Sequence, residues 1–198
     1  LPDVLDAHAL AQVDGALFDL GISSPQIDDA TRGFSYRLDG PLDMRMDRSA
    51  GATAEAVVTT YTAERLHKVL GMYGELKNAR TAANAIAAYR AKNSIRTTMD
   101  LKGAQRDVAP RGKENKYFAQ VFQALRIEVN EELKALEDFL HQCAEVLAEG
   151  GRLAIMSYHS LEDRMVKNFI NTGKPFGELE KDFYGNPLRP FEAVNRKP

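Results

Sequence analysis

Polar side chains that could bind a small molecule follow an apolar run near the start of the chain. Asp19 ends the run VDGALFD, and the tight segment GISSPQ brings Ser23, Ser24 and Gln26 shortly after it. In open α/β sheets, ligands bind at the carboxyl ends of the strands. A carboxylate there can accept hydrogen bonds from a hydroxyl or amino group of a ligand, although capping of the following turn is the commoner role. Both interpretations of Asp19 stay open at this point.

A second group of residues has the composition of an anion-binding loop. Four arginines, Arg32, Arg37, Arg45 and Arg48, are interleaved with aromatic residues such as Phe34. Arginines can bind phosphates, and aromatic rings can stack on bases. A merely solvated connection is the alternative, but the density of arginines favours an anionic partner.

A third polar segment, HSLEDR, begins at His159 and follows a second apolar run. His159 could act as a base or as a hydrogen-bond donor, and Arg164 could contact a base or a phosphate. We expect Ser160 and Asp163 to form a capping box for the next helix. The chain has no Gly-x-Ser-x-Gly elbow, which argues against a hydrolase triad. Its histidines are scattered and Cys143 lies on an apolar helix face, so no metal site is expected.

The elements that position these residues form an α/β pattern. Residues 13–20 and 152–158 predict two parallel strands, each buried on both faces, and Gly150 and Gly151 predict a helix C-cap before the second strand. Helices are expected over 53–72, 76–93, 98–109 and, as one long helix with an apolar stripe, 118–147. The long separation of the two strands predicts a host domain of residues 1–30 and 118–198 and an all-helical insert of residues 31–117.

Composition limits the class of protein. The 198 residues are 44% hydrophobic and 27% charged, which is typical of a globular chain. The net charge of -2 excludes a basic footprint over the whole domain, so nucleic-acid binding requires a local patch. A single cysteine and the lack of a membrane-length apolar run lead us to expect a cytoplasmic protein with no membrane partner. The first residue is Leu1, which suggests a fragment or a processed product.

Five blocks of sequence together resemble one family. These blocks are DGALFDLGISSPQIDD from Asp14, RGFS from Arg32, DGPLDMRM from Asp39, VFQALRIEVN from Val121 and GGRLAIMSYHSLEDR from Gly150. In this order they resemble the bacterial 16S rRNA (cytosine-N4)-methyltransferases of the MraW type. Tyr158 departs from the family pattern, in which Phe is usual, and so does KYFAQ from Lys116.

The resemblance implies an α/β fold, namely a class I (Rossmann-like) methyltransferase domain with an inserted helical domain. It further implies S-adenosyl-L-methionine as the methyl donor and a cytosine in the decoding region of 16S rRNA, within the small ribosomal subunit, as the substrate. Asp19 and Gln26 match donor-contacting positions. The chain contains no Gly-x-Gly, so the donor loop of the family would precede Leu1. The methyltransferase domain is therefore expected to be N-terminally incomplete, and the isolated chain inactive.

Roles for the remaining candidates are expectations. Ser23, Ser24 and His159 are the candidate catalytic residues near the target amine. The candidate RNA contacts are Arg32, Phe34, Arg37, Arg45 and Arg164. The exposed edge of the strand that ends in Asp19 is expected to pair with another chain, as in a dimer, or to be covered by rearranged N-terminal residues. A non-catalytic RNA- or ribosome-binding remnant is the alternative function, and the missing glycine loop disfavours an NAD-dependent enzyme.

Overall fold

The computed structural model describes residues 1–194, and the last four residues of the expected host domain lie outside the described residues. The chain divides into two compact units. We call residues 1–21 together with the chain from 133 onward the sheet unit, and residues 22–132 the helical unit. The predicted boundaries differ from these, because residues 22–30 and 118–132 belong to the helical unit. The segment 118–132 lies there because α7 (Glu114–Asn130) packs against other helices of that unit.

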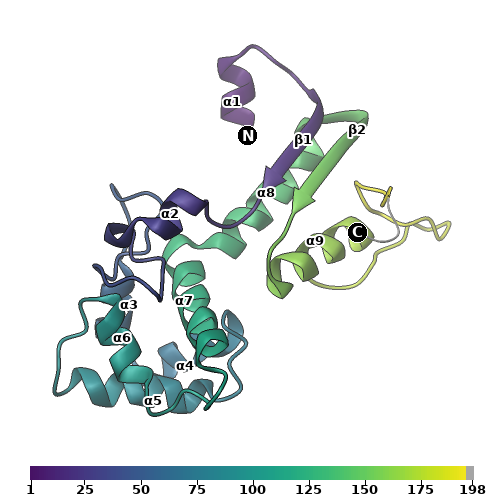
Figure 1. Cartoon of the computed structure of the whole chain (residues 1–198). Helices are drawn as coiled ribbons and strands as arrows, with labels where there is room; N and C mark the ends of the chain where they lie inside the picture. Colours follow the sequence, from purple (N-terminus) through teal and green to yellow (C-terminus); the bar gives the residue numbers. More distant parts are fainter. Residues whose placement is uncertain (195–198) are drawn as a thin grey trace. The chain divides into compact units, whose positions relative to one another are not determined.

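The sheet unit contains two parallel strands, β1 (Val13–Asp19) and β2 (Leu147–Met156), which run side by side in the same direction (Figure 1). Asp19 pairs with Met156, so the carboxyl ends of the strands coincide. This arrangement confirms the predicted α/β class with a parallel sheet. The predicted C-cap at Gly150 is wrong, because Gly150 lies within β2 with φ +79°, where the register becomes irregular.

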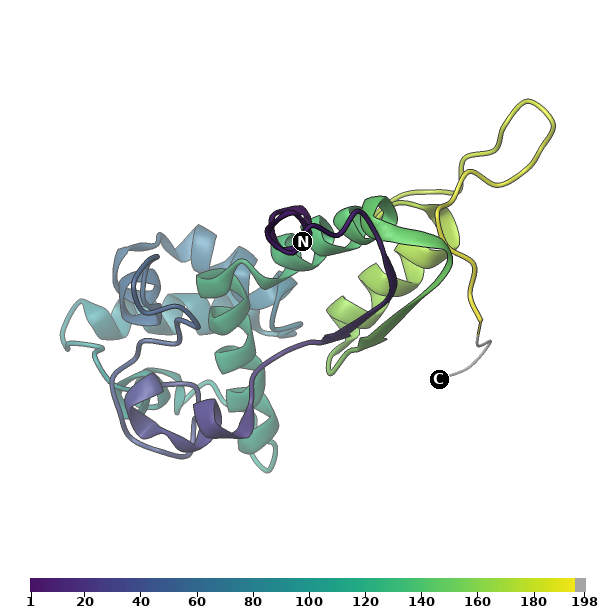
Figure 2. The same cartoon turned by 90° about the horizontal axis from the view of Figure 1, so that it is seen from above.

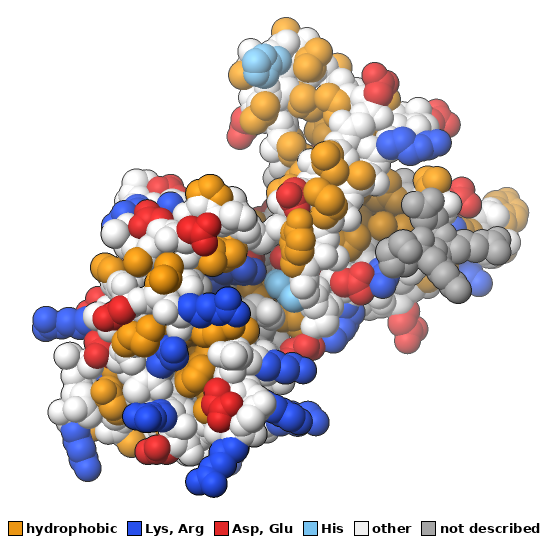
Figure 3. All heavy atoms as spheres, in the orientation of Figure 1, with side chains coloured by type: hydrophobic (Ala, Val, Ile, Leu, Met, Phe, Trp, Pro, Cys, Tyr) orange, Lys and Arg blue, Asp and Glu red, His pale blue; other side chains and the backbone are white. Residues whose placement is uncertain are grey.

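One face of this sheet is covered and the other is exposed. Two helices, α8 (Glu132–Val146) and α9 (Ser160–Thr172), form a core with Phe18, Leu153 and Ile155 of the strands (Figures 1 and 2). On the opposite face Leu17 is 71% exposed, and hydrophobic side chains gather over the strands (Figure 3). The prediction that both faces are buried is therefore wrong for the described chain. The short helix α1 (Pro2–Ala7) precedes β1.

The helical unit has its own core, built from helices that cluster together in Figure 1. Its α-helices are α2 (Ser24–Asp28), α3 (Ala54–Thr60), α4 (Ala63–Met72), α5 (Ala79–Arg90), α6 (Thr98–Gln105) and α7, with a 3-10 turn at Ala30–Arg32. The expected helix 53–72 is divided because Thr62 begins α4 as an N-cap, accepting from the backbone N–H of Arg65. The helix α6 begins at Thr98, as predicted, and Thr97 and Asp100 form a capping box at its start.

The expected single helix over 118–147 is also divided. Glu131 separates α7 from α8 and adopts the left-handed conformation, with φ 48°. The apolar stripe continues across this residue, so a spacing pattern cannot reveal the break. The side-chain amide nitrogen of Asn130 donates to the carbonyl oxygen of Arg126 at 2.9 Å, one turn back along α7.

No helix within residues 1–194 is both long enough and apolar enough to cross a bilayer.

Candidate functional site

A carboxylate and a phenol meet at the carboxyl ends of the two strands. The hydroxyl of Tyr158, just beyond β2, donates to Oδ1 of Asp19 at 2.8 Å. Hydrogen bonding to the Asp19 carboxylate raises the pKa of Tyr158, which therefore stays a donor at neutral pH. Both side chains are exposed, and Gly21 lies beside the Tyr158 ring, where an added Cβ would make only an ordinary van der Waals contact at 3.6 Å. The Asp19 carboxylate, with one oxygen hydrogen-bonded to Tyr158, thus lies at the carboxyl ends of the strands, where parallel sheets bind ligands.

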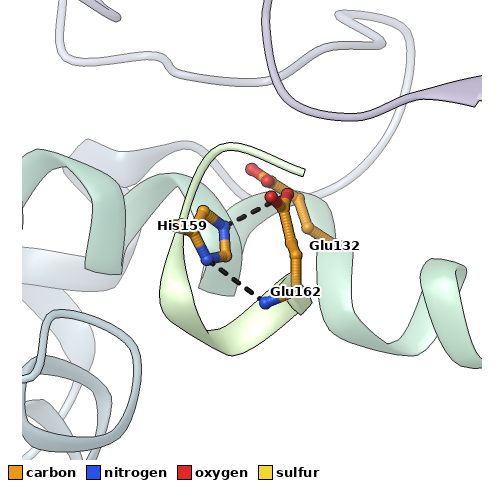
Figure 4. Close-up of side chains that lie close together, drawn as sticks. All are labelled: Glu132, His159 and Glu162. Carbon is orange, nitrogen blue, oxygen red and sulfur yellow. Dashed lines mark hydrogen bonds and ion pairs between the residues drawn. The ribbon is translucent and has the colours of Figure 1, made fainter. Parts of the chain in front are cut away.

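The segment after β2 is held by Glu162, a residue that sequence reasoning did not single out. Its side chain is only 2% exposed, and Oε2 accepts from the backbone N–H of Tyr158 at 3.0 Å. Oε1 lies 3.2 Å from Nε2 of His159 (Figure 4). Burial raises the pKa of this carboxyl, but bonding to His159 and to the Tyr158 N–H outweighs burial, so the pKa is lowered. Glu162 is therefore ionised at neutral pH and braces the strand-end loop.

His159 has a structural role that the sequence did not indicate. Its Nδ1 accepts from the backbone N–H of Glu162 at 3.4 Å, so His159 is the N-cap of α9 (Figure 4). The prediction that Ser160 caps this helix is wrong, because α9 begins at Ser160 itself. Both ring nitrogens of His159 face Glu162, an arrangement that favours support of the loop over proton transfer.

The serine loop lies at the start of the helical unit. Gln26 Oε1 accepts from the backbone N–H of Ser23 at 2.9 Å and from its hydroxyl at 3.1 Å, so these two residues close the first turn of α2. Ser24 is the first residue of that helix and is exposed. The structure brings Ser23, Ser24 and Gln26 together, whereas Asp19 belongs to the sheet unit.

Two of the four clustered arginines hold the loop that contains them. Arg32 donates to the carbonyl oxygens of Arg45 and Met46 at 2.9 and 3.0 Å. Arg45 makes a two-pronged ion pair with Asp43, with N–O distances of 2.8 and 3.0 Å. Hydrogen bonding from Arg45 lowers the pKa of Asp43 despite the burial of the carboxylate. These arginines are tied to their own loop rather than directed to solvent.

The other predicted RNA contacts differ in exposure. Phe34 is 6% exposed and belongs to the core of the helical unit, so its ring offers little surface for stacking. Arg37 is exposed, with its guanidinium carbon 5.5 Å from the centre of the Tyr36 ring. Arg164 is exposed on α9 of the sheet unit.

Asn130 is a second residue that sequence reasoning missed. Its Oδ1 accepts from the backbone N–H of Met46 at 2.7 Å, and its amide nitrogen donates to the carbonyl oxygen of Met44 at 2.8 Å. The end of α7 is therefore hydrogen-bonded to the loop that contains Arg32, Arg37, Arg45 and Arg48, called the arginine loop below. No local sequence signal could identify this contact, because the partners are 84 and 86 residues apart.

The residues present fit part of a methyl donor. Asp19 offers an exposed carboxylate of the kind that binds hydroxyl or ammonium groups, and one of its oxygens already accepts from Tyr158. A carboxylate has about four acceptor positions, so further hydrogen bonds remain available.

Comparisons with known proteins agree with this arrangement. The model of the MraW methylase family matches residues 1–198. The chain is 56% identical over 192 residues to the "Ribosomal RNA small subunit methyltransferase H" of Cytophaga hutchinsonii, covering 97% of this chain and 64% of that protein. It is 54% identical to the protein of the same name from Amoebophilus asiaticus (96% and 61% covered) and 50% identical to that of Bacteroides thetaiotaomicron (100% and 65% covered).

The chain thus spans somewhat less than two thirds of the length of these curated relatives. The match nevertheless extends across both units, from the strand-end acid to α9, and the parallel α/β arrangement is that of a class I, Rossmann-like methyltransferase. On this evidence the chain belongs to the MraW methylase family.

Proposed function

We propose that the protein, at the length of its curated relatives, methylates the N4 amine of a cytosine in the decoding region of 16S rRNA. The donor is S-adenosyl-L-methionine, the partner is the small ribosomal subunit and the location is the cytoplasm. The observation that carries the proposal is the family match over residues 1–198, supported by relatives named for methylation of small-subunit rRNA.

The donor, when bound, supplies an electrophilic methyl group on its sulfonium. Asp19 accepts a hydrogen bond from a hydroxyl or amino group of the donor, beside the bond that it already receives from Tyr158. Gln26 contributes its amide nitrogen, because its oxygen is engaged by Ser23. Glu162 and His159 keep the loop of Tyr158 in place. These contacts act mainly by positioning, which suits a displacement at a methyl group.

The target amine needs help because its lone pair is delocalised into the cytosine ring. Ser23, Ser24 and the carbonyl groups of their loop accept hydrogen bonds from the N–H groups of the amine and so raise the nucleophilicity of the nitrogen. The target base has to leave its stack to reach such acceptors. Arg37 and Arg164, both exposed, contact phosphates of the RNA, while Arg32 and Arg45 keep the loop of Arg37 in shape.

The test is methyl transfer by a protein extended to the length of the relatives. Small ribosomal subunits that lack the modification are incubated with isotope-labelled S-adenosyl-L-methionine, and the rRNA is digested and analysed by mass spectrometry. Labelled N4-methylcytidine from one site is the expected product, with Asp19→Ala as the impaired control. Label on another base, or in another RNA, would contradict the specificity proposed, and no label at all would contradict the enzyme itself, leaving a non-catalytic RNA-binding module.

A further inference from the structure

A hollow of about 380 Å³ lies on the helical unit, and none of the candidate site residues described above lines it. Its lining comes from α6, from the connection after it and from the start of α7. Three of the lining residues are apolar, namely Met99, Ala109 and Phe118, and two are cations, Lys102 and Arg106. The volume is at the lower end of the range for small-molecule sites, which matches one nucleotide rather than a larger ligand.

The spacing on α6 explains this lining. Met99, Lys102, Gly103 and Arg106 recur at intervals of three or four, so they share one side of the helix. The opposite side carries the buried Leu101 and Ala104, which anchor α6 in the core. The cationic side is therefore not a structural requirement of the core.

The cations of the hollow have no acidic partner. Across residues 1–194, no carboxylate lies within ion-pair distance of Lys102 or Arg106. Glu114 also lines the hollow, but its Oε1 accepts from the backbone N–H of Gly112 at 2.9 Å. Three exposed cations lie nearby in the sequence, namely Arg111 and Lys113 of the adjoining connection and Lys116 in the first turn of α7. The charge around the hollow thus favours an anion that is longer than a single phosphate.

An aromatic ring lies beside Lys102. The Lys102 ammonium is 5.3 Å from the centre of the Phe118 ring. Phe118 is 8% exposed and, like Phe34, belongs to the core of the helical unit, so it borders the hollow but offers little surface for stacking. Apolar side chains beside cations that have no acidic partner are a combination with which proteins bind unpaired nucleotides, through base contacts and phosphate contacts together. Here the partly exposed Met99 and Ala109 supply the apolar surface. An acidic peptide would use the cations but not the apolar floor.

We infer that this hollow binds one unpaired nucleotide of an RNA strand, with its phosphates on Lys102 and Arg106 and the strand continuing along Arg111 and Lys113. The inference rests on the proposed function, because it supplies an RNA contact on the helical unit for the same substrate. It moves the main RNA-binding surface away from Arg32 and Arg45, which have internal partners, to α6.

The test measures binding of a fluorescent single-stranded RNA of about eight nucleotides, within the usual site size for unpaired strands, to the whole 198-residue chain at several salt concentrations. Charge reversal at two sites, Lys102→Glu with Arg106→Glu, should raise the dissociation constant about tenfold. It should also reduce the slope of its logarithm against the logarithm of salt concentration by about 1.4, because each lost phosphate contact removes about 0.7. The matched control is Lys68→Glu with Arg80→Glu, which makes the same charge change at two exposed residues of α4 and α5.

A milder pair, Lys102→Gln with Arg106→Gln, keeps the test valid if charge reversal perturbs folding, which circular dichroism reports. The inference would be overturned if the substitutions at Lys102 and Arg106 changed the dissociation constant no more than the control pair did. It would also be overturned if the unaltered chain bound no RNA. Equal affinity for a poly-glutamate peptide would overturn it as well. Methyl transfer by the extended protein is measured in parallel. If the protein is active but both pairs of substitutions change RNA affinity equally, only RNA binding in the hollow is rejected. If the protein is inactive, the proposed enzymatic function is rejected.

Discussion

Glu162 fixes the loop at the carboxyl end of β2 with a charge that is almost completely buried. Glu162→Ala would leave the backbone N–H of Tyr158 without its acceptor, and an unsatisfied buried donor costs about 1–3 kcal/mol. We therefore expect a lower midpoint of urea unfolding, with little change in the m-value. A matched change at the exposed Glu145 should have almost no effect.

The same carboxylate should make stability depend on pH. Burial raises the pKa of Glu162, but bonding to His159 and to the Tyr158 N–H lowers it further, below the ordinary value of 4.5. Its contribution to stability is therefore fully present above about pH 4.5 and is lost as the pH falls through the lower folded pKa. Glu162→Gln should flatten this part of a stability–pH curve measured between pH 3 and 7. A curve that keeps its acid slope would show that other carboxylates cause it.

Cys143 is completely buried, and burial raises the pKa of its thiol to about 11. Because the thiolate is the reactive form, the folded chain should resist alkylation by iodoacetamide at pH 8, whereas chain unfolded in urea should react fully. Mass spectrometry of the intact chain counts the added groups. Rapid modification of folded protein would show that α8 opens readily.

At the scale of elements, the break between α7 and α8 depends on one unfavourable residue. Glu131 has φ 48°, a conformation that costs a residue with a Cβ roughly 1 kcal/mol and that glycine adopts without strain. Glu131→Gly should therefore raise the free energy of unfolding by about 0.5–1 kcal/mol, even though glycine is unfavourable inside helices. Glu137→Gly, placed within α8, is the control and should destabilise. Loss of stability with both variants would mean that Glu131 makes contacts worth more than its strain.

The elements also show which structural features the sequence could predict. Helices marked by an apolar stripe and a capping residue, such as α6 with Thr97 and Asp100, are recognisable because both signals are local. The left-handed Glu131 leaves no such signal, and neither does the exposure of Leu17, because an apolar run predicts a strand without stating what covers each face. The prediction of a C-cap at Gly150 is wrong because a glycine beyond a helical stripe indicates a C-cap and a strand irregularity equally well.

The candidate site divides in the same way. The acid at a strand end is predictable from Asp19 alone, because its place follows from the strand before it. The partners Tyr158 and Glu162 required knowledge of which strand pairs with β1. The inward roles of Arg32 and Arg45 depend on carbonyl groups and on a carboxylate whose directions only the folded loop determines.

At the scale of the whole molecule, the length of the chain sets an expectation for donor binding. The relatives are longer, and the 198 residues contain no Gly-x-Gly that could approach the donor closely. The entropic cost of ordering the donor is the same with few contacts as with many. Without the contacts of a glycine loop, the isolated chain should therefore bind S-adenosyl-L-methionine very weakly and transfer no methyl group. In a protein of the relatives' length, Asp19→Ala should raise the dissociation constant without unfolding the domain. Calorimetry tests both statements, and micromolar binding by the isolated chain would contradict the first.

The open edge of the sheet leads to a separate expectation for the isolated chain. Within residues 1–194, β2 is the only strand that pairs with β1, and an unpaired apolar strand promotes association. We expect the 198-residue chain to sediment as a dimer or larger species, and Leu17→Lys on the exposed face to shift it toward monomer. A purely monomeric chain at high concentration would contradict this.

The side chain of Asn130 has a consequence for the time course of folding. By accepting the N–H of Met46, it closes a loop of 84 residues, and closing such a loop costs about 4 kcal/mol of chain entropy. The hydrogen bond can offset this entropic cost only after the intervening helices have formed and shortened the distance between Met46 and Asn130. The Met46 amide should therefore be among the last in the helical unit to gain protection from deuterium during refolding. In the native state the Met46 amide should exchange whenever the final turn of α7 frays. Hydrogen exchange at this one amide therefore reports when the loop of Arg32, Arg37, Arg45 and Arg48 has formed.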